Sequence, residues 1–195
     1  MSKIIPSNND TANVSYLPLL DTESSVMFFL SEPAISTISF FKGDVNLDES
    51  KKWLKDRLTT ICMANLWLVG RLVRNKKINK NVLLKIPQPL SEADVEAIIC
   101  VDTGNNLSSI STQTPYESIV DTLHKSKLVV GPGYKLVNKD LRTSKFTLVK
   151  VADNEVALVV SITHAGKSAL VSLYHMISCV RYMKTRDLDT SFGLY

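Results

Sequence analysis

The spacing of hydrophobic residues changes near the C-terminal end of the chain, within the stretch NEVALVVSITHAGKSALVSLYHMI. A continuous apolar run rich in β-branched residues comes first, and apolar residues at helical spacing follow. This change predicts a strand over Val156–Thr163 and a helix from about Ser168 to Lys184. His164 then stands on a short loop between them, where a fold can hold a polar side chain rigidly and still present it to a ligand.

Two earlier segments show the same contrast. Ser36–Lys42 is rich in residues that favour a strand, and Leu47–Ala64 carries leucines on one face of a long helix. Asn46 and Glu49 have the spacing of a capping box in front of this helix. The helix is followed by Gly70, where the chain can turn.

Three strands, a short helix and a turn are predicted in the middle of the chain. Arg71–Arg74 is expected to pair with Asn81–Ile86 across a basic turn, and Val95–Asp102 reads as another strand. A short helix is expected to begin at Thr114, Pro115 and Glu117, with Thr114 as the cap and Pro115 in the first helical position. Gly131–Tyr134 is expected to be a turn.

The last two strands are predicted to form an antiparallel hairpin. Phe146–Val151 leads through the tight turn ADNE into Val156–Thr163, so that the hairpin ends at His164. This order of elements predicts an α+β fold, a two-layer sandwich with a mixed, mainly antiparallel sheet and helices on one face. We expect residues 1–15 to be a flexible arm and residues 16–195 to form a single domain.

Composition is that of a globular protein with little preference for nucleic acid. The chain has 195 residues, of which 45% are hydrophobic, and its formal net charge is +4. The basic residues are spread out except for one cluster without interleaved aromatic residues, which favours a solvated turn over a nucleic-acid site. The members of this cluster are Arg71, Arg74, Lys76, Lys77 and Lys80.

Cysteine usage and the lack of long apolar runs favour a cytoplasmic location. Cys62, Cys100 and Cys179 are far apart and each lies in an apolar stretch, so we expect buried free thiols in a reducing compartment. No run approaches the roughly 20 apolar residues of a membrane span, and the N-terminus has no apolar signal region. We therefore expect no transmembrane segment.

A histidine at a strand end is often structural, but it can also act as a general base. Imidazole titrates near neutral pH and can accept a proton from a hydroxyl or amine that attacks an acyl group. A metal site is not expected, because His124 and His175 lie on other elements and no cysteine stands at ligand spacing.

Several stretches, taken in order, resemble the chloramphenicol acetyltransferase-like acyltransferases. They are NLDESKKWLKDRLTTICMANLWLVGRLV, LVVGPGY and FTLVKVADNEVALVVSITHA, within Tyr16–Met183. This superfamily includes alcohol acyltransferases, wax ester synthases and condensation domains, and the resemblance is to its N-terminal half. It implies transfer of an acyl group from acyl-CoA or a carrier thioester, as co-substrate rather than bound cofactor, to an alcohol or amine. His164 would be the general base.

The chain departs from the family's His-x-x-x-Asp-Gly motif after the histidine. The Asp and Gly places fall on Ser168 and Ala169, or on Gly166 and Lys167 if the loop has lost two residues, so neither register supplies a carboxylate. Ser168 could replace part of the lost loop hydrogen bonds, with Gly166 in the loop, or Ser168 could cap the following helix.

Size is a second departure, because most of these enzymes carry two such domains in one chain. The resemblance therefore implies a homo-oligomer or a partnership with a second acyltransferase-like chain, with no nucleic-acid partner. Two functions stay open from the sequence: an acyltransferase that uses His164, and a catalytically degenerate domain of this fold that acts as a binding or assembly partner.

Overall fold

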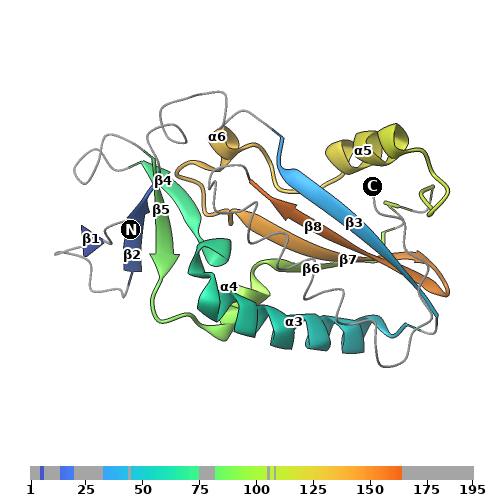
Figure 1. The fold of residues 1–195 in the computed structure, drawn as a ribbon, viewed down its shortest axis with the longest axis horizontal. Helices are drawn as coiled ribbons and strands as arrows, with labels where there is room; N and C mark the ends of the chain where they lie inside the picture. The colour runs from blue at the N-terminus through green and yellow to red at the C-terminus, as the bar shows by residue number, and fades with distance from the viewer. Residues whose placement is uncertain are drawn as a thin grey trace.

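The larger sheet of the fold has four strands in the order β3–β8–β7–β6 (Figure 1). The computed structural model describes residues 5–6, 14–19, 33–43, 45–74, 82–104, 106–107 and 109–163. Strands β3 (Ile35–Lys42), β8 (Glu155–Ile162) and β7 (Ser144–Ala152) are antiparallel neighbours, whereas β6 (Ile99–Asp102) runs parallel to β7. The predicted hairpin and the strand at Ser36–Lys42 are confirmed.

A smaller antiparallel sheet has the order β1–β2–β5–β4. Its strands are β1 (Ile5–Pro6), β2 (Val14–Pro18), β5 (Val82–Pro87) and β4 (Arg71–Arg74). The predicted pairing of the last two is confirmed, with Leu72 opposite Leu84. Between α3 and β4 lies the 3-10 helix η1 (Leu66–Val69), whose Trp67 packs against the hydrophobic clusters of both sheets.

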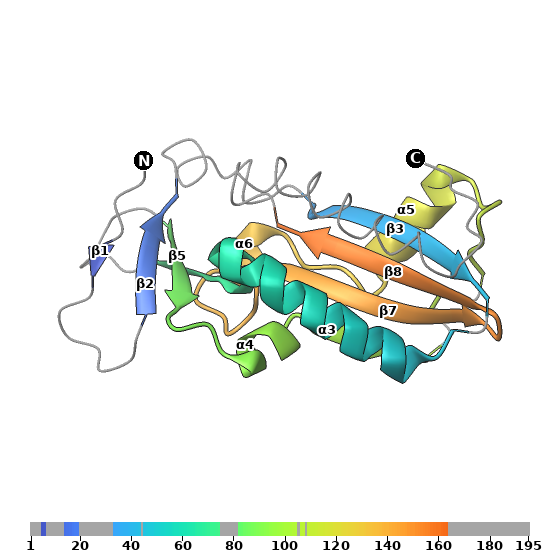
Figure 2. The same cartoon turned by 60° about the horizontal axis from the view of Figure 1, so that its bottom comes forward.

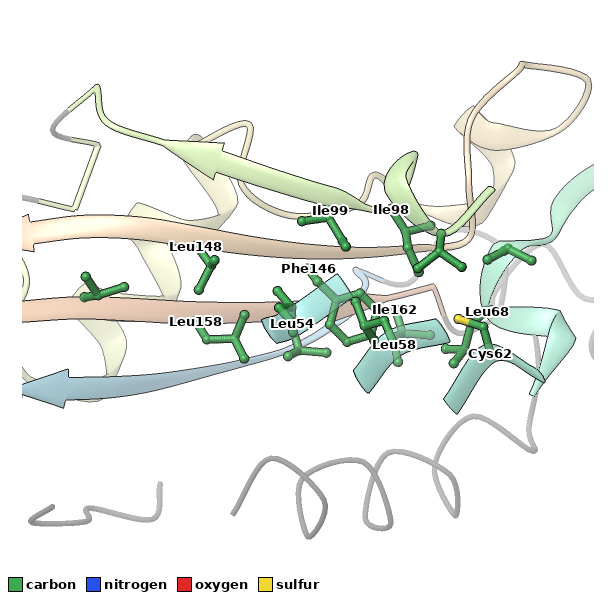
Figure 3. Close-up of a cluster of buried hydrophobic side chains, with 14 residues drawn as sticks. Leu54, Leu58, Cys62, Leu68, Ile98, Ile99, Phe146, Leu148, Leu158 and Ile162 are labelled. Carbon is green, nitrogen blue, oxygen red and sulfur yellow. The ribbon is translucent and has the colours of Figure 1, made fainter. Parts of the chain in front are cut away.

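Helix α3 (Leu47–Ala64) covers one face of the larger sheet (Figures 1 and 2). The Asn46 side chain caps it, accepting hydrogen bonds from the backbone N–H groups of Asp48 (2.9 Å) and Glu49 (3.2 Å), which confirms the predicted start. Leu54 and Leu58 are buried against Phe146, as Figure 3 shows. Burial of each such side chain stabilises the fold by about 1.5–3 kcal/mol.

The opposite face of the larger sheet carries α5 (Tyr116–Lys125) and the loop before it. Ile119 and Leu123 of this helix belong to a cluster with Val149 of β7 and Val159 of β8. The predicted α+β class, with a mixed and mainly antiparallel sheet packed on helix α3, is confirmed. The prediction placed helices on one face only, and α5 on the opposite face is an additional element.

The predicted strand at Val95–Asp102 is wrong in its first half. Ser91 caps a short helix, α4 (Glu92–Glu96), and its hydroxyl accepts from the Asp94 N–H while the Asp94 carboxylate accepts from the Ser91 N–H. This reciprocal cap commits Val95 to the helix, and the strand β6 begins only at Ile99. The signal was present in the sequence as Ser91 with Asp94 three residues later.

Two predicted local structures differ in detail. Thr114 does not cap α5, because its hydroxyl accepts from the Ser111 N–H (2.8 Å) and closes the preceding turn, while Pro115 occupies the cap position itself. The expected turn at Gly131–Tyr134 instead enters a one-turn helix, α6 (Gly133–Leu136), whose Leu136 is buried in the core of the smaller sheet.

Candidate active site

The candidate site begins where the central strand β8 ends. Ile162 is paired on one side with Ile35 of β3 and on the other with Ser144 of β7, so β8 has a strand on both sides up to its last residue. The Thr163 N–H then donates to the Thr143 carbonyl oxygen (2.9 Å). The end of this strand is therefore held from two sides, as a rigid support for a reactive loop requires.

The predicted site residues follow immediately in the sequence. His164 is the next residue after Thr163, and Gly166 and Ser168 come after it. All three lie outside the described residues, as does the predicted helix at Ser168–Lys184. Their roles stay predictions, whereas the predicted strand that leads to them is confirmed.

Polar contacts fix the start of β7 against the segment between α3 and β4. The Thr143 N–H donates to the Gly70 carbonyl oxygen (3.1 Å), and the Thr143 hydroxyl donates to the Trp67 carbonyl oxygen (3.1 Å). The Ser144 hydroxyl donates to the Leu68 carbonyl oxygen (2.7 Å). Because the Thr143 carbonyl oxygen also accepts from the Thr163 N–H, these bonds connect the segment between α3 and β4 to the end of β8.

An ion pair adds a further link beside these hydrogen bonds. The Arg142 guanidinium donates to the Asp94 carboxylate (2.7 Å) and to the Val69 carbonyl oxygen, and the two charged side chains are only 9% and 15% exposed. Burial raises the pKa of the Asp94 carboxyl, but hydrogen bonds from Ser91 and Arg142 lower it more, so the net pKa lies below its usual value.

Buried hydroxyl groups lie on the face of β7 and β8 opposite α3. The Ser161 hydroxyl oxygen accepts from the Val130 N–H (3.0 Å) and from the Ser36 hydroxyl (2.9 Å). The Thr147 hydroxyl donates to the Leu128 carbonyl oxygen (3.1 Å). These bonds hold the segment before α6 against the hairpin.

Thr163 differs from these hydroxyl-bearing residues. The residue is 1% exposed, and its hydroxyl oxygen has no hydrogen-bond partner within the described ranges. Thr163 was not among the site residues predicted from the sequence. Ser161 and Thr163 are two residues apart, so a strand places them on the same face. The missing hydrogen-bond partner of the Thr163 hydroxyl is visible only in the structure.

The two described cysteines have different environments. Cys62 is buried, as expected, and burial raises the pKa of its thiol to about 12. The expectation that Cys100 is buried is wrong: it is exposed, because β6 is an edge strand of the larger sheet and Ile99 takes the inward position. Cys179 lies outside the described residues.

The described residues bring together no group of three or more histidine, cysteine or acidic side chains that could hold a metal ion. No helix in the part of the chain that the structure describes is long and apolar enough to cross a membrane.

No family model and no curated protein sequence matches the chain, whereas several solved structures do. It is similar to the TRI3 trichothecene 15-O-acetyltransferase of Fusarium sporotrichioides, with a TM-score of 0.53 and 9% identity over 82% of this chain and 33% of that one. It is also similar to F. graminearum TRI101, solved with Coenzyme A and T-2 mycotoxin, with a TM-score of 0.50 and 12% identity over 87% and 40%.

A third similar structure is a protein described as a CT mutant, with a TM-score of 0.51 and 12% identity over 91% of this chain and 36% of that one. The chain thus spans between 33% and 40% of the length of these three proteins. At these identities the similarity shows a common fold. The chain shares the fold of part of each of these three proteins.

Proposed function

We propose that the chain is an acyltransferase-like protein that transfers an acyl group from a CoA or carrier thioester to an alcohol or amine, with His164 as the general base. The observation that carries this proposal is the end of β8. In a fold shared with the TRI3 acetyltransferase and with TRI101, strand β8 ends at Ile162, two residues before a histidine. The similarity to TRI101, which was solved with Coenzyme A, supports a CoA thioester as donor.

The proposed step needs only a base and a stabilised oxygen. The His164 imidazole takes the proton from the acceptor hydroxyl or amine as the acceptor oxygen or nitrogen attacks the thioester carbonyl carbon. Negative charge develops on the carbonyl oxygen and must be held by a hydrogen-bond donor. When the carbonyl re-forms, the carbon–sulfur bond breaks, and the thiolate leaves and receives the proton from the imidazolium.

A catalytically degenerate domain is the second candidate, and the sequence after His164 favours it. Ser168 or Gly166 stands where related enzymes have an aspartate, so no carboxylate would fix the loop. A base that is poorly oriented can lose orders of magnitude in rate and still act. Restoring the carboxylate with Ser168→Asp should raise the rate if the loop has kept its length.

Assembly is part of the proposal because the chain spans at most 40% of the length of the three similar proteins. A single domain leaves the reaction open on one side, where water competes with the acceptor. We therefore propose that the active form is a homo-oligomer or contains a second acyltransferase-like chain, in the cytoplasm. Light scattering on the protein during turnover tests this, and a monomer with full activity would contradict it.

The proposed function is tested by release of free thiol from acetyl-CoA in the presence of mixed alcohols and amines. Acceptor-dependent release, with the acetylated product found by mass spectrometry, supports the acyltransferase. Release that is equal without acceptor is hydrolysis and contradicts it. Protein that binds acetyl-CoA without turnover supports the degenerate domain.

A further inference from the structure

The segment Lys127–Gly133, here called the crossing segment, passes over the β7–β8 hairpin on the face opposite α3. Leu128 accepts from Thr147, which is paired in the sheet with Val159. Val130 donates to Ser161 (3.0 Å). Leu128 therefore lies at the level of Val159 and Val130 at the level of Ser161. The crossing segment thus runs beside β8 toward the end of that strand.

The next step of this register would pair Thr163 with Pro132. Proline has no backbone N–H, so it cannot repeat for Thr163 the hydrogen bond that Val130 makes to Ser161. A Cβ atom placed on Gly131 would meet no atom within 4 Å, so there is open space beside Gly131, one residue before Pro132. Thr163 is thus the last hydroxyl-bearing residue on this face of β8, and the crossing segment offers no backbone N–H to its hydroxyl oxygen.

The lack of a partner is unusual for so buried a hydroxyl. Thr143, Ser144, Thr147 and Ser161 are also buried, and each of their hydroxyl groups is hydrogen-bonded. A buried hydroxyl without a partner destabilises the folded state, so proteins rarely keep one without a reason. The position of Thr163, directly before His164, suggests a ligand as the missing partner.

We propose that the Thr163 hydroxyl donates a hydrogen bond to the carbonyl oxygen of the acyl thioester. This inference rests on the proposed acyl transfer. A thioester carbonyl oxygen can only accept a hydrogen bond, and the Thr163 hydroxyl, which has no hydrogen-bond partner among the described residues, can donate one. As the acceptor attacks, negative charge grows on that oxygen, and the hydrogen bond strengthens until the carbon–sulfur bond breaks.

The first test is thermal stability and does not require activity. Thr163→Val keeps the shape of the side chain and removes a hydroxyl that has no partner among the described residues, so the melting temperature should stay equal or rise. Thr147→Val is the matched control, because it removes a buried hydroxyl that is bonded and should lower the melting temperature. An equal loss in both variants would overturn the proposal.

The second test is acetyl transfer from acetyl-CoA. Thr163→Val should lower kcat by about a hundredfold, the range for loss of one oxyanion donor, with a smaller change in KM. Thr163→Ser, which restores the hydroxyl, should recover most of the rate. If the parent is active and Thr163→Val is equally fast, this inference fails while the proposed function stands.

If the parent transfers no acetyl group, a third measurement separates failure of the proposed function from failure of the inference about Thr163. Calorimetric titration with acetyl-CoA should then show weaker binding by Thr163→Val than by the parent, by about tenfold, with Thr147→Val unchanged. In that case the proposed function fails while the binding role of Thr163 is supported. Equal affinity in the parent and Thr163→Val, or no binding of acetyl-CoA by the parent, overturns the inference.

Discussion

The Arg142 guanidinium lies 2.7 Å from the Asp94 carboxylate and joins the start of β7 to the first turn of α4. Because Arg142 also donates to the Val69 carbonyl oxygen, one side chain connects three segments that are distant in the sequence. The connection lies next to Thr143, which bonds to Thr163. The ion pair therefore helps to fix the strand end that precedes His164.

Asp94→Asn should destabilise the chain by about 3 kcal/mol, because it leaves the largely buried Arg142 charge without its counter-ion. Asp140→Asn is the matched control. Asp140 pairs with Arg71 at 2.6 Å but is 87% exposed, so its loss should cost less than about 1 kcal/mol. Urea denaturation at neutral pH measures both, and equal losses would contradict the structural role of the buried pair.

The contribution of Asp94 should also depend on pH. Its carboxyl has a lowered pKa in the folded chain, so the stability it adds is complete above the unfolded value of about 3.9 and is lost as pH falls through the lower folded value. The stability difference between the parent and Asp94→Asn should therefore shrink below about pH 4. A difference that stays constant down to about pH 2 would show that the charge of Asp94 is not involved.

Gly70→Ala should destabilise the fold by overpacking. A Cβ atom at Gly70 would lie 2.6 Å from Cδ1 of Leu84 and 3.0 Å from the Trp67 carbonyl oxygen, and Leu84 is buried in the smaller sheet. We expect a loss of about 1–3 kcal/mol in chemical denaturation. Gly131→Ala, where a Cβ atom has open space, should be nearly neutral.

A double variant identifies the cause of this loss. In a Leu84→Ala background the main clash at Gly70 is gone, so Gly70→Ala should cost much less there than in the parent, which is the signature of coupled neighbours. If the cost is the same in both backgrounds, contact with Leu84 is not its origin.

The cysteine environments predict selective labelling. In a Cys179→Ser background, a maleimide should modify one thiol of the native protein, Cys100, because Cys62 is buried and the pKa of its thiol is raised to about 12. Denatured protein should react at both. Labelling of Cys62 in the native state at a rate similar to that of Cys100 would contradict the packing of α3 on the sheet.

The sequence predicted well the elements whose hydrophobic period is long and unambiguous. Helix α3 has its predicted ends, since Asn46 and the spacing of Leu54 and Leu58 agree with each other. The segment Val95–Asp102 has no such agreement, because a short apolar run fits a strand and a helix equally. The cap at Ser91 decided between them.

Tertiary contacts could not be predicted from local patterns. Cys100 is exposed because β6 is an edge strand. The position of a strand within a sheet cannot be predicted from the residues of that strand alone. The bonds from Thr143 and Ser144 to the segment around Leu68 join positions more than 70 residues apart. The unpartnered hydroxyl of Thr163 depends on the path of the crossing segment and on Pro132, and it became visible only with the fold.

The most direct test of the proposed function compares the acetyl-transfer rates of two histidine variants. His164→Ala removes the proposed base, whereas His124→Ala removes an exposed histidine on α5 and serves as the matched control. We expect His164→Ala to lose at least about a hundredfold in kcat/KM with an unchanged melting temperature, and His124→Ala to keep the parent rate. Transfer by His164→Ala as fast as by the parent would contradict the proposal that His164 is the general base.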